Sequence, residues 1–236
     1  MDALTTSGTR PASTVVLMRD ASAGPEVLVV ARGTCGAVPG MFAFPGGVVE
    51  SDDGPMTDEA GSGYRMAACR ETFEETGLLL TRDATPGMDL LRRARQDLLA
   101  CRMGFDAVLA SLGVRPALSE LTYFARWITP LALPKRFDTR FFLMCAPAAE
   151  AEPDGVEIVD VRWATPAAAL AGANAGSMPM VNATMKTLEW LVRFGSVDEA
   201  RAGLGSTNID AILPKAKRQG EGFHIVNPWE AGYADI

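Results

Sequence analysis

The sequence has little of several residue types that catalytic sites often use. Its 236 residues include one histidine, four cysteines and only 7% aromatic residues. A zinc site built on several imidazoles is therefore excluded, and any Ser-His-Asp mechanism would have to use the single histidine, His224. If the protein carries out hydrolytic chemistry, we expect carboxylates rather than imidazoles to perform it.

The cysteines are scattered and form no Cys-x-x-Cys pair, which excludes a zinc ribbon and a thioredoxin-like motif. We expect all four, Cys35, Cys69, Cys101 and Cys145, to be small buried hydrophobes in a reducing compartment. The N-terminus does not look like a signal peptide, and no apolar run approaches the roughly 20 residues that a membrane span requires. The sequence thus predicts a cytoplasmic protein that does not bind membranes.

Acidic residues exceed basic ones, with 29 Asp+Glu against 22 Lys+Arg and a formal net charge of -7. This balance argues against non-specific binding of nucleic acid, which depends on basic side chains that neutralise phosphates. Apolar residues make up 48% of the chain and charged residues 22%, as in globular proteins with a hydrophobic core. A disordered chain is therefore excluded as well.

The order of the expected elements predicts an α/β fold. Strands are expected at 13–19, 26–32, 48–50, 78–80, 121–129, 140–146 and 156–163. Helices are expected at 64–76, 88–102, 104–112, after Thr165-Pro166, at 181–194 and after a capping box that begins at Ser196. Because the two kinds of element interleave, we expect a mixed α/β sandwich formed by one core domain with a helical insertion.

Three glutamates share one face of the expected helix 64–76. On a helix that advances 100° per residue, Glu71, Glu74 and Glu75 fall within an arc of about 100°. Like charges at this spacing destabilise an isolated helix by roughly 0.2–0.5 kcal/mol per pair, and a divalent cation would remove that cost. Carboxylate ligands without imidazole or thiolate indicate a hard cation, Mg2+ or Mn2+.

Arg70 and the pair Gly46-Gly47 accompany these glutamates. Arg70 lies next to Glu74 on the helix surface, where it is placed to hold a carboxylate. The two glycines would let the backbone approach a ligand closely or adopt a positive φ. The alternative is a solvated acidic helix face after a tight turn. The combination of Gly-Gly, Arg-Glu, Glu-Glu and a terminal Gly77 favours the metal site over that alternative.

The segment that begins at Gly47 resembles a Nudix box, in which a Gly is followed by five residues, Glu, seven residues and Arg-Glu-U-x-Glu-Glu-x-Gly-U, with U apolar. The second half of the motif matches at Arg70, Glu71, Glu74, Glu75, Gly77 and Leu78, with Thr72 in the first U position. Asp53 takes the position of the first Glu, and about nine extra residues separate it from Arg70. Whether Glu50, Asp52 or Asp53 contributes a metal ligand is left open.

The resemblance implies a hydrolase that cuts the P–O–P bridge of a nucleoside diphosphate derivative with water and Mg2+ or Mn2+. It implies that Glu74 and Glu75 bind the metal, that Glu71 is a further ligand or the base, and that Arg70 orients the glutamates. The expected fold is a Nudix-type α/β/α sandwich over residues 10–195, with the helical insertion at about 84–115. Residues 196–236 are expected to form a C-terminal extension packed on or beside that domain.

A second resemblance concerns the substrate. The segments Phe44-Pro-Gly-Gly-Val-Val, Trp127-Ile-Thr-Pro and Arg136-Phe-Asp-Thr-Arg-Phe-Phe are similar to a Nudix subgroup of coenzyme A and acyl-coenzyme A diphosphatases, over about residues 12–195. The second arginine of the coenzyme A signature is missing from the loop before Gly40. Alternatives are therefore a diphosphatase of ADP-ribose, NADH or another nucleoside diphosphate derivative, and a binding regulator without turnover.

Basic residues outside the box are candidates for contact with substrate phosphates. Arg32, Arg136 and Arg140 are the expected substrate-binding arginines, together with Gly46 and Gly47. The alternative is that these arginines are ordinary surface charges. The expected partner is a small nucleoside diphosphate substrate, and a homodimer is possible. Apolar residues of the 88–112 helices would cover the sheet or a dimer partner, or would line a route for an acyl chain.

Overall fold

The computed structural model describes residues 6–34, 39–57, 60–205, 209–220 and 222–235. The strands are β1 (Thr9–Arg19), β2 (Glu26–Arg32), β3 (Phe42–Ala43), β4 (Gly46–Val48), β5 (Thr122–Ile128), β6 (Arg136–Cys145), β7 (Ile158–Ala164), β8 (Ala211–Ile212), β9 (Lys215–Gln219) and β10 (Gly222–Val226). The helices are α2 (Ser62–Thr76), α3 (Met88–Leu99), α4 (Phe105–Leu112), α5 (Pro166–Asn174), α6 (Asn182–Leu191) and α7 (Val197–Leu204), with short 3-10 helices η1 (Ser51–Asp53), η2 (Leu118–Glu120) and η3 (Tyr233–Asp235).

A mixed sheet forms the centre of the molecule, with strand order β3-β2-β1-β6-β5-β8. The short strand β4 also pairs with β1, and β7 pairs with β2. β1 runs parallel to β6 and antiparallel to β2 and β4. In this register Ser13 lies between Gly47 of β4 and Arg140 of β6. The sheet therefore places Gly47 and Arg140, which are far apart in the sequence, on either side of Ser13.

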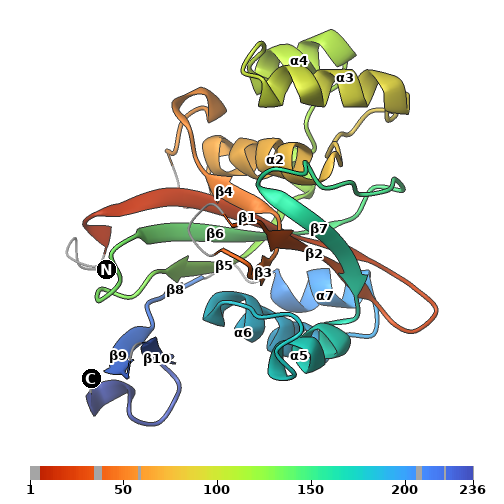
Figure 1. Cartoon of the computed structure of the whole chain (residues 1–236). Coiled ribbons are helices and arrows are strands. Elements are labelled where there is room, and N and C mark those ends of the chain that lie inside the picture. The colour runs from red at the N-terminus through yellow and green to blue at the C-terminus, as the bar shows by residue number, and fades with distance from the viewer. Residues whose placement is uncertain (1–5, 35–38, 58–59, 206–208, 221, 236) are drawn as a thin grey trace.

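Helices cover both faces of the sheet, which confirms the expected α/β/α sandwich (Figure 1). On one face, α2 packs on β1 and the α3–α4 pair lies over α2. On the other face lie α5, α6 and α7. Side chains of β1 alternate between the two cores, since Val15 and Leu17 face α2 whereas Val16 and Met18 face the opposite helices.

Helix α2 carries the predicted acidic face and has clear ends. It begins at Ser62, two residues before the predicted start, and its first turn is tied to the sheet because Ser13 Oγ donates to the Tyr64 carbonyl at 2.6 Å. It ends at Thr76 and is capped by Gly77, which has a left-handed φ of 73° and donates its N–H to the Phe73 carbonyl. Glycine adopts this conformation without the cost that a Cβ imposes. The predicted C-terminal end is therefore confirmed.

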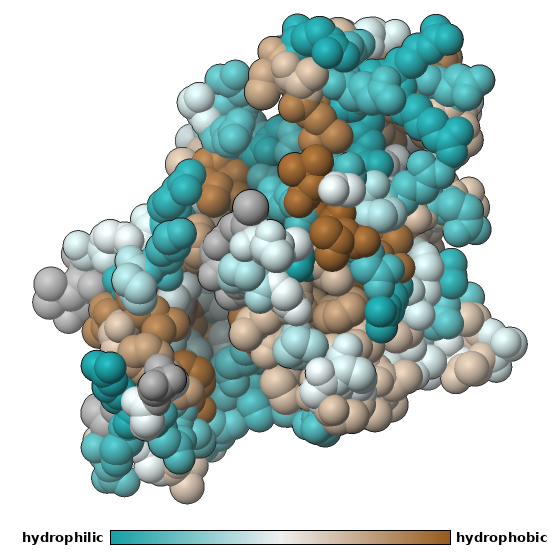
Figure 2. Space-filling view, in the orientation of Figure 1, coloured by the Kyte–Doolittle hydropathy of each residue, from teal (hydrophilic) through white to brown (hydrophobic). Residues whose placement is uncertain are grey.

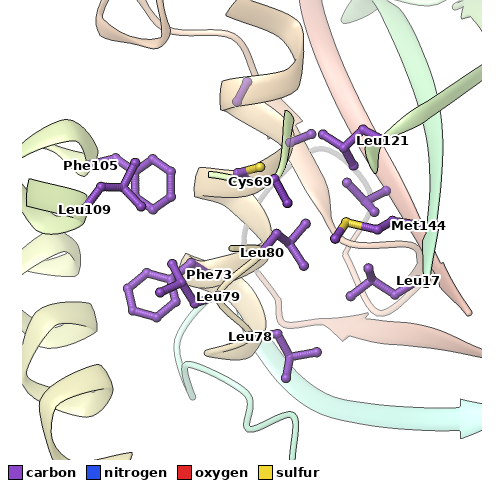
Figure 3. Close-up of a cluster of buried hydrophobic side chains, with 14 of the residues drawn as sticks. Leu17, Cys69, Phe73, Leu78, Leu79, Leu80, Phe105, Leu109, Leu121 and Met144 are labelled. Carbon is purple, nitrogen blue, oxygen red and sulfur yellow. The ribbon is translucent and has the colours of Figure 1, made fainter. Parts of the chain in front are cut away.

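The helical insertion, which consists of α3 and α4, packs on the face of α2 that points away from the sheet. The rings of Phe73 in α2 and Phe105 in α4 lie 6.3 Å apart between centroids. Figure 3 shows Phe105 and Leu109 directed toward Phe73 and Leu79, within one buried apolar cluster. The outward surface of α3 and α4 is mainly hydrophilic (Figure 2). The insertion is therefore anchored by an apolar inner face.

Several predicted elements differ from the structure. Residues 78–80 are buried as expected but form no strand, because these leucines link α2 to the insertion and pack within the core on the α2 side of the sheet. A short apolar run does not by itself distinguish such a link from a buried strand. Strand β6 begins at Arg136 rather than at residue 140, since pairing with β1 starts at Thr9. The strands β8, β9 and β10 have no counterpart among the predicted elements.

The cysteine prediction is wrong in part. Cys69 is buried, whereas Cys101 and Cys145 are exposed, and these three are free thiols. Cys35 lies outside the described residues. Among the residues that the structure describes, no helix combines the length and apolar character needed to cross a membrane.

Candidate active site

Arg70 gathers the acidic side chains of the predicted site. Its guanidinium is buried between α2 and the end of β4, where Nη2 donates to the Val48 carbonyl at 2.8 Å. Nη1 donates to Glu71 Oε1 and to Glu74 Oε2, at 3.0 Å in each case. One nitrogen therefore holds two of the three predicted metal ligands together at the surface of α2.

Asp53 fixes Arg70 from the opposite side. Arg70 Nε donates to Asp53 Oδ1 and Nη2 donates to Oδ2, both at 2.9 Å, in a bidentate pair that is almost fully buried. Asp53 Oδ2 also accepts the backbone N–H of Glu50 at 2.8 Å, within the 3-10 turn η1. Because both Asp53 oxygens are engaged, the residue in the first acidic position of the box anchors Arg70 here. Asp52 is exposed.

Gly47 makes room for the Glu71 carboxylate. A Cβ on Gly47 would overlap Glu71 Oε1, Oε2 and Cδ. Any larger residue at this position would displace the carboxylate from its place between β4 and α2. The neighbouring Gly46 is equally confined, since a Cβ there would collide with the Ser13 carbonyl. The close approach predicted for the glycine pair is therefore an approach to Glu71 and to β1.

Glu75 lies deeper than the other two glutamates. Its Oε2 accepts the backbone N–H of Gly46 at 2.9 Å, and its Oε1 accepts a hydrogen bond from Arg32 Nη2 at 3.0 Å. The same Arg32 nitrogen donates to the Gly46 carbonyl at 2.8 Å, and Nη1 is paired with Glu157. Arg32 at the end of β2 therefore holds Glu75 against β4.

The three glutamates all have raised pKa values, and burial is the largest cause for each. Burial raises the pKa of Glu71 to about 7, against the opposing effect of Arg70, and the charge of Glu74 adds to the rise. The pKa of Glu75 lies well above its ordinary value, with Arg32 opposing and Glu71 reinforcing the effect of burial. In the absence of a cation these carboxylates are therefore costly to keep ionised.

The donor set fits a hard divalent cation in its chemistry. It consists of carboxylate oxygens in a partly buried place, and the side chains of Glu71 and Glu74 retain 14% and 23% exposure, so an ion from solvent can reach them. Among the described residues, no three acidic, histidine or cysteine side chains already surround one point. To hold one cation, the three carboxylates would therefore have to lie closer together than they do here.

The raised pKa of Glu71 predicts that the metal-free protein loses stability as the pH rises. Between the ordinary value of 4.5 and about 7, folded Glu71 keeps a proton that the unfolded chain has released, so the free energy of unfolding falls across this window. The pKa difference corresponds to about 3 kcal/mol. Urea unfolding in EDTA should show this fall for the native protein and a smaller one for Glu71→Gln. Parallel pH curves for the two proteins would contradict the assignment.

Arg140 lies close to the site in the sheet but is engaged in a buried ion-pair cluster. It stands across β1 from Gly47, two strand spacings or roughly 10 Å away. Arg140 Nη1 is 2.7 Å from Asp138 Oδ1, and Arg126 forms a bidentate pair with the same carboxylate at 2.9 and 2.8 Å. The Arg140 guanidinium also lies 4.1 Å from the centre of the Tyr64 ring. Arg140 thus connects β6 to the start of α2.

Arg136 is farther from the glutamates. It precedes Arg140 by four residues of β6, roughly 13 Å along the strand. Its Nε donates to the Thr129 carbonyl at 3.1 Å and Nη1 to the Ser7 carbonyl at 2.6 Å. Of the three predicted phosphate contacts, the structure places Arg32 at the glutamates, Arg140 nearby and Arg136 at the far end of β6.

Sequence reasoning missed Glu157, which pairs with Arg32 and adds to the rise in the pKa values of Glu71 and Glu75. It immediately precedes β7, and the antiparallel pairing of β7 with β2 brings it to Arg32. It also missed the Asp138 cluster and a contact from Arg95 in the insertion to the Glu74 carbonyl. Glu157 and Arg95 reach the site from distant elements, so no local pattern marks them, whereas Asp138 lies two residues from Arg140 on β6.

Comparison with known proteins first defines the class. A solved Nudix hydrolase from Alicyclobacillus acidocaldarius has the same fold, with a TM-score of 0.72, 31% sequence identity and coverage of 82% of this chain and 96% of that one. The general Nudix domain model matches residues 8–98. The NUDT19 Nudix domain model matches residues 55–185, which is more than half of the chain. The chain belongs to the Nudix hydrolases, in the NUDT19 Nudix domain family.

Two curated relatives are each about one third identical to this chain. Putative nudix hydrolase 7 of Caenorhabditis elegans is 32% identical over 146 residues, which cover 59% of this chain and 45% of that protein. The human acyl-coenzyme A diphosphatase NUDT19 is 33% identical over 152 residues, which cover 54% of this chain and 39% of that protein. The chain thus spans less than half the length of these two relatives.

Proposed function

We propose that this protein hydrolyses the pyrophosphate bond of coenzyme A or an acyl-coenzyme A with the help of Mg2+ or Mn2+. The observation that carries the proposal is the cluster of Glu71 and Glu74 on Arg70, with Glu75 beside them and Gly47 leaving room for Glu71. The substrate class is supported by the similarity to proteins named acyl-coenzyme A diphosphatase in human and Xenopus laevis.

In this proposal each residue of the cluster has a separate task. Glu74 and Glu75 hold the cation, and Glu71 is a further ligand or the base that takes a proton from the attacking water. Arg70, which is fixed by Asp53, orients the carboxylates of Glu71 and Glu74. Arg32 orients the carboxylate of Glu75. The bound metal would neutralise the charge of the pyrophosphate and lower the pKa of water.

A second substrate class is favoured by one observation. Arg32, the arginine that the coenzyme A signature supplies here, is already paired with Glu75 and Glu157, and the second arginine of the signature is missing from the sequence. A site with fewer free cations fits ADP-ribose or NADH, which lack the 3′-phosphate of coenzyme A. The two classes share the reaction and the metal site.

A substrate panel tests the proposal. The protein is incubated with coenzyme A, a long-chain acyl-coenzyme A, ADP-ribose and NADH, in Mg2+, in Mn2+ and in EDTA, and the products are separated by chromatography. We expect metal-dependent release of 3′,5′-ADP and a phosphopantetheine product. Cleavage of ADP-ribose or NADH without turnover of coenzyme A would refute the substrate class. Absence of turnover for the whole panel would indicate a binding domain instead.

A further inference from the structure

A side chain of the insertion meets the end of α2 where Glu74 and Glu75 lie. Arg95 of α3 is half-buried, and both its Nε and Nη2 donate to the main-chain carbonyl of Glu74, at 3.0 and 2.8 Å. This oxygen belongs to the last turn of the helix, where carbonyls lack a partner within the helix. The N–H of Leu78, which would continue the pattern, donates to Thr76 Oγ1 instead. Arg95 therefore caps α2 from outside.

Packing alone does not explain an arginine at this position. Burial lowers the pKa of Arg95, so the charged form loses solvation in the folded protein. A leucine would fill the same place between two helices without that cost. The arginine instead supplies two hydrogen bonds and a positive charge at the negative end of the helix dipole. The lack of a side chain at Gly77 leaves it room, since a Cβ there would lie 3.2 Å from Arg95 Nη1.

The insertion has a second connection to the same helix end, which does not involve Glu74. Arg92, one turn before Arg95, pairs with Glu152 at 2.7 Å. The backbone N–H of Glu152 donates to the Thr76 carbonyl at 2.8 Å. Both arginines attach the insertion to the end of α2, but of the two only Arg95 binds the backbone of a predicted metal ligand. Comparing variants of Arg92 and Arg95 therefore distinguishes an effect of docking the insertion from an effect on the glutamates.

We propose that Arg95 is a positioning residue that fixes the last turn of α2, so that Glu74 and Glu75 keep the geometry needed for cation binding. This inference rests on the proposed function, since it assumes that these glutamates are ligands. Both hydrogen bonds of Arg95 end on the main chain, so its effect passes through the position of the helix backbone. The insertion would then be part of the metal site as well as a cover for α2.

The test measures Mn2+ binding by electron paramagnetic resonance, together with kcat and KM in saturating metal. Arg95→Ala is expected to weaken Mn2+ binding about tenfold, the scale typical of residues that orient metal ligands, with lower kcat and little change in KM. Arg95→Lys should recover part of the affinity, because an ammonium group can donate to the same carbonyl. Arg93→Ala is the matched control, since Arg93 is an exposed arginine of the same helix.

Two results would overturn the inference alone. One is a folded Arg95→Ala protein that binds Mn2+ as the native protein does. The other is an equal loss in Arg92→Ala, which would show that docking of the insertion is what matters. If Arg95→Ala fails to fold, Arg95→Gln and Arg95→Lys carry the same comparison. Native protein that neither binds Mn2+ nor turns over any diphosphate would refute the proposed function, and this inference with it.

Discussion

Replacing Glu74 and Glu75 together by glutamine is expected to abolish hydrolysis while the protein stays folded. Glutamine keeps the size of each side chain and one oxygen that can accept from Arg70 at position 74 and from the Gly46 N–H at position 75, while its NH2 group at position 75 would face Arg32. It removes the negative charges that the proposed cation needs. Loss of metal stabilisation is worth several kcal/mol in the transition state, so we expect kcat to fall by about 1000-fold or more.

We expect the double variant to lose activity without a comparable loss of stability. Burial raises the pKa of Glu74 and of Glu75 in the metal-free protein, so removing their charges is expected to affect folding less than it affects turnover. The measurements are metal-dependent turnover and the thermal unfolding midpoint. Glu120→Gln, at an exposed glutamate away from the cluster, is the control and should behave as the native protein. Native-like turnover by the folded double variant would refute the metal site.

The part of the site that lies within one helix could be predicted from the sequence. Helical periodicity places Glu74 next to Arg70 and puts Glu71, Glu74 and Glu75 on one face, and Gly77 marks the end of α2, because these relations depend only on residues within two turns. The α/β class also follows from the alternation of strand and helix patterns. Local spacing is sufficient where the chain itself fixes the distance between two side chains.

The partners that hold these glutamates could not be predicted in the same way. Arg32 reaches Glu75 from β2, and Glu157 reaches Arg32 only because β7 pairs with β2. That pairing joins segments more than 120 residues apart, and no feature in the sequence of either segment indicates that the two strands pair. Asp138 lies two residues from Arg140 on the same face of β6, but the second arginine on its carboxylate, Arg126, comes from the neighbouring strand β5.

Asp53 shows a third situation, in which the motif is interrupted. The extra residues between Asp53 and Arg70 break the spacing from which a ligand role could be judged. In the structure, the 3-10 turn η1 and a hydrogen bond from the Glu50 N–H direct the Asp53 carboxylate toward Arg70. Asp53 and Arg70 are therefore in contact although the extra residues separate them in the sequence.

Arg70→Ala is expected to be the most destabilising single change at the site. The substitution leaves the buried Asp53 carboxylate without its bidentate partner and removes the cation shared by Glu71 and Glu74. Removing one partner of a buried ion pair costs about 3–5 kcal/mol, because the remaining charge stays buried and uncompensated. Arg70→Lys keeps the charge but loses the planar fork that spans Asp53 and both glutamates, so we expect it to recover only part of the loss.

Chemical denaturation of these variants, with Arg102→Ala as a control, measures the effect. Arg102 also forms an ion pair, 2.7 Å from Asp97, but both side chains are exposed, and such pairs contribute less than about 1 kcal/mol. Adding Asp53→Asn to Arg70→Ala should restore stability, since the uncompensated carboxylate is then neutral. If the double variant is as unstable as Arg70→Ala, the loss does not come from Asp53. The contacts with Glu71, Glu74 and the Val48 carbonyl would then be what Arg70 contributes to the fold.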